Sequence, residues 1–110
     1  MIMIPLENDK QTISNRFRKA DNFVLIDDND MRVLKNSHKQ SKSNEFFDFF
    51  QTLNVDTIYL KNIGLKTFIK LNDMKIDVYI IDEDKISNLA TANKTKLNLE
   101  NIKDFATLGH

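Results

Sequence analysis

The order of apolar and polar segments along the chain predicts a β-sheet with helices packed against it. Five short apolar runs are bounded by turn-forming or charged residues, as β-strands are. They cover residues 1–6, 22–27, 30–35, 55–60 and 75–82. The second and third runs are joined by the polar stretch DDND, which favours a tight hairpin turn. Pro5 falls near the end of the first run, and a strand tolerates proline only at an edge or a terminus.

The polar stretch SHKQSKS then leads into a phenylalanine-rich segment with helical spacing. Its apolar residues recur at i, i+3, i+4 and i+7, which is one face of an amphipathic helix. They are Phe46, Phe49, Phe50 and Leu53. We expect Ser43 or Asn44 to be the N-cap of this helix. Phe47 falls off the apolar face, so we expect it either to pack sideways or to meet a partner.

Two further helices and a packed tail are predicted in the second half. Residues 64–73 form a helix whose expected inward residues are Leu65, Phe68, Ile69 and Asn72. Residues 82–93 begin with acids, which suit a helix N-terminus, and carry Ile86, Leu89 and Ala90 toward the core. In the tail, residues 95–110, the apolar residues Leu97, Leu99 and Ile102 are expected to hold the segment against the body.

Strand–helix–strand order with short links predicts a parallel pair of strands with a right-handed crossover. The hairpin before it adds antiparallel strands. We therefore predict an α/β fold, with a mixed five-stranded sheet flanked by helices. A chain of 110 residues is the size of one domain, so residues 1–110 are expected to form a single domain.

Composition narrows the classes of function. The 16 basic and 16 acidic residues give a formal net charge of zero, which argues against a general nucleic-acid or membrane-surface binder but allows a local basic patch. The absence of cysteine excludes disulfides and thiolate metal ligands. The apolar runs are too short for a membrane span, and the N-terminus MIMIPLEND is too short and acidic for a signal peptide. We expect a cytoplasmic protein with no nucleic-acid or membrane partner.

A candidate anion site lies at the start of the helix that follows residues 55–60. Gly64 is one of only two glycines and stands where free backbone N–H groups and the positive end of the helix dipole face outward. Lys61 adds a cation and Asn62 a donor, with Ile63 between them and the glycine. The alternative is structural: Gly64 only forms the turn, and Lys61 is a solvated lysine.

Four stretches resemble, in order, the dinitrogenase iron–molybdenum cofactor biosynthesis family. MIMIPLEND is similar to the opening strand of that family, and KLNLENI is similar to its closing tail. ISNRFRKADNFVLID is similar to the segment S-x-x-F-G-R-A-x-x-F, with Ser14, Phe17, Ala20 and Phe23 in register. VDTIYLKNIGLKTFIKLNDMKIDVYI is similar to the strand, N-I-G junction, helix and strand of the family. The likeness covers nearly the whole chain.

This resemblance implies a ribonuclease H-like fold and the binding of a negatively charged iron–sulfur or iron–molybdenum cluster. The N-I-G helix start, with Lys61 before it, suits such a ligand, and so does the loop SNRFRK, which supplies Arg16, Arg18 and Lys19. The alternative for the loop is an ordinary solvated run of charge. The implied partner is a metallocofactor assembly protein.

The chain also departs from the family pattern. Arg16 stands where the family often has histidine, Arg18 where it has glycine, and Lys19 where it has arginine. The family's Gly-rich loop after the hairpin is here NSHKQSKSNEF, without glycine. His38 in this loop is the one candidate metal ligand within the body, because His110 is terminal. The alternative for His38 is a solvent-exposed loop histidine. With so few soft ligands, binding through positive charge and backbone N–H groups is expected rather than multidentate ligation.

The sequence favours a non-enzymatic function. Nuclease chemistry on a ribonuclease H-like fold needs converging carboxylates, one of them in the first strand, and MIMIPL has none. The acids after residues 22–26 belong to a turn, and those at residues 82–84 to a helix start. Two hypotheses remain: a carrier or accessory protein for an anionic cluster, and a degenerate family member that acts as a protein-interaction module. If Arg16, Arg18, Lys19 and Lys61 point into one cleft, the first hypothesis is favoured. If they scatter and Phe47 lies on a flat exposed patch, the second is favoured.

Overall fold

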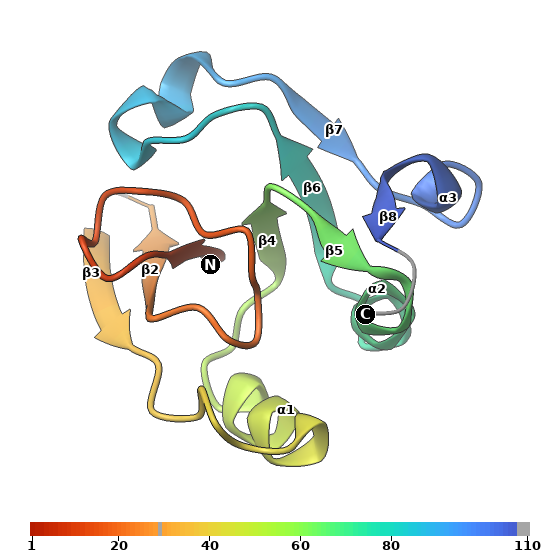
Figure 1. Ribbon diagram of the computed structural model, residues 1–110, viewed down its shortest axis with the longest axis horizontal. Coiled ribbons are helices and arrows are strands. Elements are labelled where there is room, and N and C mark those ends of the chain that lie inside the picture. The colour runs from red at the N-terminus through yellow and green to blue at the C-terminus, as the bar shows by residue number, and fades with distance from the viewer. Residues whose placement is uncertain (29, 108–110) are drawn as a thin grey trace.

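Strand β1 lies inside a mixed sheet that organises the whole molecule (Figure 1). The computed structural model describes residues 1–28 and 30–107. The sheet has six strands in the order β3-β2-β1-β4-β6-β7. Their bounds are β1 Ile2–Leu6, β2 Asn22–Asp27, β3 Asp30–Lys35, β4 Thr57–Leu60, β6 Asp77–Ile81 and β7 Lys94–Lys96.

Strands β1, β4 and β6 run parallel, and β2, β3 and β7 run antiparallel to their neighbours. This confirms the predicted mixed α/β sheet, but the predicted count of five strands is wrong. The sixth strand, β7, has the sequence Lys-Thr-Lys with all three residues exposed, so no apolar pattern marks it. Pairing with β6 creates it.

Pro5 is accommodated because β1 is only partly flanked by β4. The pairing of β1 with β4 covers Ile2 and Met3, whereas Pro5 is opposite Phe23 of β2. Beyond β4, the carbonyl of Pro5 instead accepts a hydrogen bond from the Ser14 backbone N–H at 2.9 Å. Proline therefore falls near the strand end, as expected, although β1 itself is an interior strand.

A second, two-stranded sheet joins the middle of the chain to its C-terminal part. Strand β5 (Ile63–Gly64) pairs in parallel with β8 (Ala106–Thr107), just after helix α3 (Ile102–Phe105). Leu97 and Ile102 are buried in the main core. Leu99, which was expected to help hold this segment, is 67% exposed. His110 lies outside the described residues.

Helix α1 (Ser43–Gln51) covers one end of the sheet with three buried phenylalanines. They are Phe46, Phe47 and Phe50. All four residues of the predicted apolar face pack on the core, with Phe46 and Phe50 buried and Phe49 and Leu53 half-buried. Phe47, which was expected either to pack sideways or to meet a partner, joins the core at 5% exposure. The prediction of the N-cap was wrong, because Lys42 occupies that position without a side-chain capping bond.

Helix α2 (Leu65–Asp73) turns a different face to the core from the one its pattern predicted. Phe68 and Leu71 are buried, whereas Leu65 and Ile69 are 37% and 43% exposed. Asn72, the fourth residue of the expected face, is exposed. Phe68 lies between two apolar faces of the helix, one with Leu65 and Ile69 and the other with Leu71. Contact with β6 buries the face with Leu71.

The segment expected to form a third α-helix contains instead the 3₁₀ helix η1 (Ile86–Thr91). Ile86 and Leu89 are half-buried against the second face of the sheet, and Ala90 is exposed. None of the helices in residues 1–28 and 30–107 is long and apolar enough to cross a membrane.

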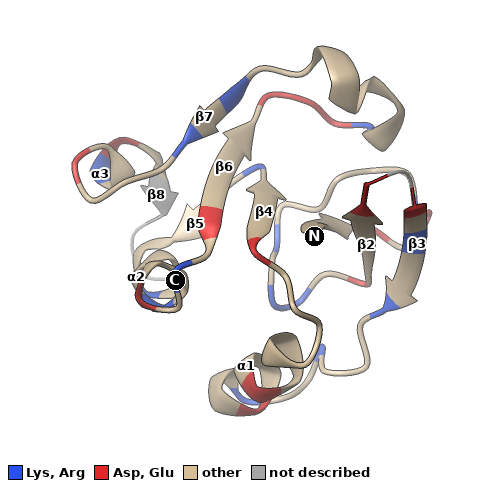
Figure 2. Cartoon of the chain, turned by 180° about the vertical axis from the view of Figure 1, so that it is seen from behind, with Lys and Arg blue, Asp and Glu red and all other residues tan. Residues whose placement is uncertain are grey.

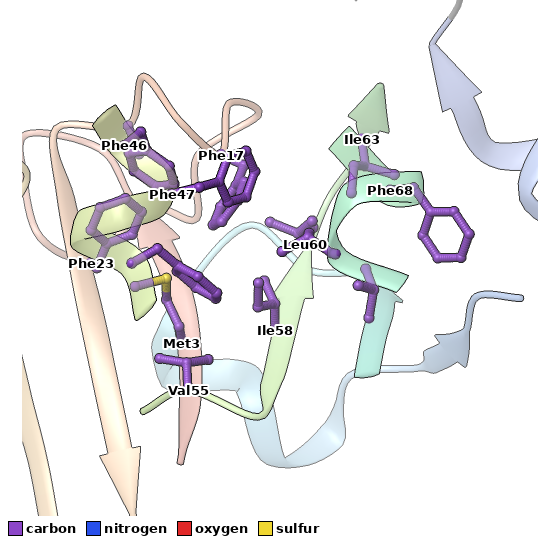
Figure 3. Packing of buried hydrophobic residues seen from close by; sticks show 14 of the residues in the cluster. Met3, Phe17, Phe23, Phe46, Phe47, Val55, Ile58, Leu60, Ile63 and Phe68 are labelled. Carbon is purple, nitrogen blue, oxygen red and sulfur yellow. The ribbon is translucent and has the colours of Figure 1, made fainter. Parts of the chain in front are cut away.

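The main core lies between the sheet and the two longer helices (Figure 3). Phe17, from the loop between β1 and β2, packs edge-on against Phe46 at 5.3 Å and Phe50 at 5.9 Å between ring centroids. It also contacts Phe23 of β2 at 6.2 Å. A smaller cluster on the other face includes Ile4, Leu6, Ile13, Val24 and Ile81.

A network of polar contacts closes the second face. The Asp9 carboxylate accepts hydrogen bonds from the backbone N–H groups of Gln11 and Thr12 at 2.9 and 2.8 Å, and from the Thr12 hydroxyl at 2.6 Å. Lys85 donates to the Thr12 hydroxyl at 2.7 Å and lies 3.7 Å from Asp9. The hydrogen bonds of Thr12 and Gln11 hold the pKa of Asp9 well below its usual range.

Replacing Phe46 with alanine is expected to destabilise the fold by about 3–5 kcal/mol, because a fully buried ring in contact with five others is lost. Urea unfolding followed by circular dichroism measures the change. Leu99→Ala, at a residue 67% exposed, is the matched control and should shift stability by less than about 0.5 kcal/mol. Equal effects of the two substitutions would contradict the assignment of the core.

Asp9 is expected to make stability depend on pH under acidic conditions. Its pKa in the folded protein is below the ordinary value of 3.8, so its contribution to stability is complete above that value and is lost as the pH falls toward the folded pKa. Asp9→Asn keeps an acceptor oxygen but cannot titrate, so its urea midpoint should fall less between pH 5 and pH 2 than that of the wild type. Glu100→Gln, at an exposed carboxylate, is the control and should follow the wild-type curve.

Candidate functional site

The loop between β1 and β2 alternates buried and exposed residues, and this alternation projects its cations outward. Phe17 is anchored in the core at 6% exposure, and Ala20 is fully buried. Arg16 and Lys19 are exposed, and Arg18 is half-buried. The blue positions of this loop lie beside β4 in Figure 2.

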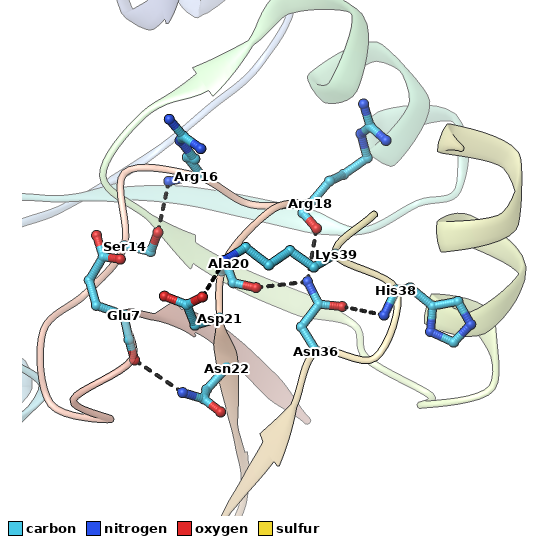
Figure 4. Close-up of polar contacts among 10 residues, drawn as sticks. All are labelled: Glu7, Ser14, Arg16, Arg18, Ala20, Asp21, Asn22, Asn36, His38 and Lys39. Atoms are coloured by element: carbon cyan, nitrogen blue, oxygen red, sulfur yellow. Dashed lines mark hydrogen bonds and ion pairs between the residues drawn. The ribbon is translucent and has the colours of Figure 1, made fainter. Parts of the chain in front are cut away.

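Buried polar side chains hold the backbone of this loop (Figure 4). Asn36 is 4% exposed, and its Nδ2 donates to the carbonyls of Arg18 and Ala20, both at 2.9 Å. Its Oδ1 accepts from the His38 backbone N–H at 3.0 Å. At the other end of the loop, the Ser14 hydroxyl accepts from the Arg16 backbone N–H at 3.0 Å. The basic side chains therefore extend from a fixed backbone.

The start of helix α2 lies opposite this loop. Gly64 is the N-cap residue, with φ −77° and ψ 150°, so an ordinary extended conformation is present and a positive φ does not explain the glycine. Its missing Cβ leaves the first turn of the helix open to close approach. No side chain caps this helix, and its first turn carries no acidic residue, so the positive end of the dipole is not offset locally.

Between the loop and the helix start lies a cavity of about 630 Å³. Its lining residues are Asn15, Arg16, Phe17, Arg18, Lys19, Asn62, Ile63, Gly64 and Thr67. Six of the eight residues predicted from the sequence are thus brought together, and none of the lining residues is acidic. Within residues 1–28 and 30–107, no carboxylate forms an ion pair with Arg16, Arg18 or Lys19. This charge distribution suits an anion.

Lys61 lies outside the cavity. Its ammonium group forms an ion pair with Asp84, in the segment after β6. This pairing lowers the pKa of Asp84, through the hydrogen bond from Lys61 and then through its charge. The structure therefore gives Lys61 a role in joining two loops and does not add its charge to the cavity.

His38 is also absent from the cavity lining. Its ring stacks on Phe49 with 4.2 Å between centroids and 16° between planes, and its Nδ1 lies 3.1 Å from the Ser37 hydroxyl. In the described part of the chain, no group of three or more His, Cys, Asp or Glu residues is arranged to hold a metal ion. His38 therefore packs against Phe49, and among the described residues it belongs to no group of side chains that could hold a metal ion.

Three residues of this region were not among the candidates predicted from the sequence. Asn15 and Thr67 line the cavity, and Asn36 fixes the loop. Asn15 adjoins the basic run and Thr67 lies in the first turn of α2, so both could have been found from their neighbours. Asn36 carried no such signal, because its partners are distant in sequence.

Comparison with known proteins supports both fold and family. No curated protein sequence is similar enough to count as a relative. Among solved structures, the chain is similar to an NMR structure of a provisionally assigned NifB protein from Thermotoga, described as a DUF35 family member. The TM-score is 0.64 at 18% sequence identity, over 82% of this chain and 83% of that one, and this likeness shows the fold alone.

The family of this chain is shown by a match to its sequence. The family described as dinitrogenase iron-molybdenum cofactor matches residues 1–95, which include β1 to β6 and every residue that lines the cavity. This chain belongs to the dinitrogenase iron-molybdenum cofactor family.

Proposed function

We propose that this chain binds an anionic iron–sulfur or iron–molybdenum cluster as cargo and does not catalyse a reaction. The observation that carries the proposal is the cavity in which Arg16, Arg18 and Lys19 face the open start of helix α2. Membership of a family named for the iron–molybdenum cofactor supports the identity of the cargo.

The chemistry of the lining residues favours contact with the periphery of a cluster over bonds to its metal ions. Guanidinium groups donate paired hydrogen bonds to carboxylates and other oxyanions, and the side chains of Asn15, Asn62 and Thr67 add neutral donors. Iron in clusters prefers thiolate or imidazole ligands, and the lining contains neither. The cluster would therefore keep the ligands with which it arrives.

A carrier must release its cargo, and binding through charge suits release. Salt-sensitive contacts to a cluster leave its metal ions available to a receiving protein, which we expect to be a metallocofactor assembly protein. The cavity is open to the surface beside a loop that carries the three cations, so a partner protein can reach it. We place this exchange in the cytoplasm.

The alternative of a degenerate protein-interaction module depended on an exposed Phe47. Phe47 is 5% exposed, and the ammonium group of Lys70 lies 5.8 Å from its ring centroid. The side chain thus contributes to the core. Three of the four cations that were expected to share one cleft gather at the cavity, and the fourth, Lys61, pairs with Asp84 instead. Together with the buried Phe47, this favours the carrier hypothesis.

The acidic residues support a non-catalytic protein. Glu83 accepts hydrogen bonds from the backbone N–H groups of Asp84 and Lys85 at 2.9 and 3.3 Å, which lower its pKa together with a bond from Asn88. Asp84 is paired with Lys61. These carboxylates stabilise local structure, and among the described residues they do not gather into a metal-binding group.

We also infer a ribonuclease H-like fold. Its support is the order of the first five strands of the sheet, β3-β2-β1-β4-β6, with an antiparallel hairpin beside parallel strands β1, β4 and β6. Strand β7 and the β5–β8 pair are additions to that arrangement.

Replacing both Arg16 and Arg18 with alanine should weaken cluster binding by at least about tenfold, because each arginine supplies charge-assisted hydrogen bonds. Anaerobic titration with isolated iron–molybdenum cofactor and with its iron–sulfur precursor, followed by visible absorption and EPR, measures the affinity. Lys103→Glu, at an exposed lysine of α3, changes the total charge by the same two units and should bind as the wild type does. Unchanged affinity in the double variant would contradict the site.

His38→Ala and added salt together separate charge from ligation. We expect the variant to bind with wild-type affinity and an unchanged EPR spectrum, because His38 stacks on Phe49 outside the cavity. Raising the salt from 0.05 to 0.5 M should weaken binding in both proteins to the same extent. If cluster binding by the wild type resisted salt and His38→Ala abolished it, the imidazole would instead be a ligand of iron.

A further inference from the structure

The two edges of the main sheet differ sharply. Strand β7, at one edge, has three residues, two of which are lysines, and short charged strands are poor templates for pairing. Strand β3, at the other edge, has six residues in unbroken register with β2 and no bulge or proline. Within the described chain, nothing pairs with its outer side (Figure 1).

The direction of each backbone group in β3 can be assigned. The Asn36 backbone N–H donates to the Asp21 carbonyl at 3.0 Å, so the backbone groups of position 36 point toward β2. Because the direction alternates along an antiparallel strand, those of Asp30, Arg32 and Leu34 also point inward. The outward groups belong to Met31, Val33 and Lys35, which are free to pair with another strand.

Two of these three positions carry exposed apolar side chains. Met31 is 60% exposed and Val33 is 48% exposed. They are opposite Ile26 and Val24 of β2, so they extend the apolar second face of the sheet to its open edge. Free backbone groups and uncovered apolar side chains thus coincide.

We propose that β3 pairs antiparallel with β3 of a second copy of this chain, with Val33 opposite Val33 across a two-fold axis. In a symmetric antiparallel pair, opposite residues have their side chains on the same face of the sheet. One residue of β3 must therefore lie opposite its own copy, with the two-fold axis between them. With Val33 on the axis, the outward groups of Met31 pair with those of Lys35 at both ends. The two sheets then form one continuous sheet.

The side chains of β3 favour this register over the neighbouring one. With Val33 on the axis, Arg32 lies opposite Leu34 and Asp30 opposite Asn36, so no like charges face each other directly. With Arg32 on the axis, two guanidinium groups would meet, and Lys35 would lose its partner in β3. With Leu34 on the axis, Met31 would lose its partner in β3. Only the Val33 register pairs all three outward positions within β3, and this self-complementarity favours a second copy over an unrelated strand.

The proposed interface and the cavity do not overlap. No residue of β3 lines the cavity, so the pairing is independent of cluster binding. A substitution in β3 can be tested without disturbing Arg16 or Arg18.

Sedimentation velocity of the full chain over a range of concentrations tests the proposal. We expect a reversible dimer whose dissociation constant rises at least about tenfold in Val33→Lys, because two ammonium groups would then lie opposite each other. Leu99→Lys adds the same charge at a residue 67% exposed outside the edge and should dimerise as the wild type does. Circular dichroism confirms that each variant is folded.

A spin label tests the register. The chain has no cysteine, so Val33→Cys gives a single labelling position. Opposite residues of a hydrogen-bonded antiparallel pair have Cα atoms about 5.5 Å apart, so the dimer should broaden the EPR spectrum, and dilution with unlabelled chain should reverse the broadening. Leu99→Cys is the control and should show no broadening. A monomer at every concentration, or a dimer unaffected by Val33→Lys, would overturn the proposal.

Discussion

The contact of Phe17 with the phenylalanines of helix α1 is the interaction on which the candidate site depends. One ring from a surface loop enters the core and packs edge-on against Phe46 and Phe50. The neighbours of Phe17 in sequence are Arg16 and Arg18, which the anchored ring forces toward the surface. Hydrophobic burial thus sets the position of charge, and the hydrogen bonds of Asn36 fix the backbone that carries it.

The chain keeps this local charge despite a formal net charge of zero. Four lysines elsewhere form ion pairs with carboxylates, among them Lys61 with Asp84 and Lys96 with Asp77. Such exposed pairs contribute little to stability, but they neutralise cations outside the cavity. The cations of the Phe17 loop are left without such partners in the described part of the chain. The field at the cavity is consequently stronger than the composition indicates.

Two surfaces of the molecule are therefore distinct in chemistry. The cavity offers cations and neutral donors, as a site for an anion would. The edge at β3 offers backbone groups and apolar side chains, which suit another strand. A dimer formed through β3 would join two copies of the chain. Because no residue of β3 lines the cavity, the paired strands themselves would not cover it.

The sequence by itself determined five strands of the main sheet, the hairpin and the set of basic loop residues, because period-two patterns and turn residues act over a few neighbouring positions. It also named six of the residues that line the cavity, but the tertiary structure brought them together. Only the tertiary structure decided which face of each helix is buried, since Phe47 and Phe49, or Leu65 and Leu71, are equally apolar. Strand β7 forms because β6 offers it an edge, and Lys61 turns to Asp84 because two loops meet. These outcomes depend on contacts between residues far apart in the chain, which no local pattern encodes.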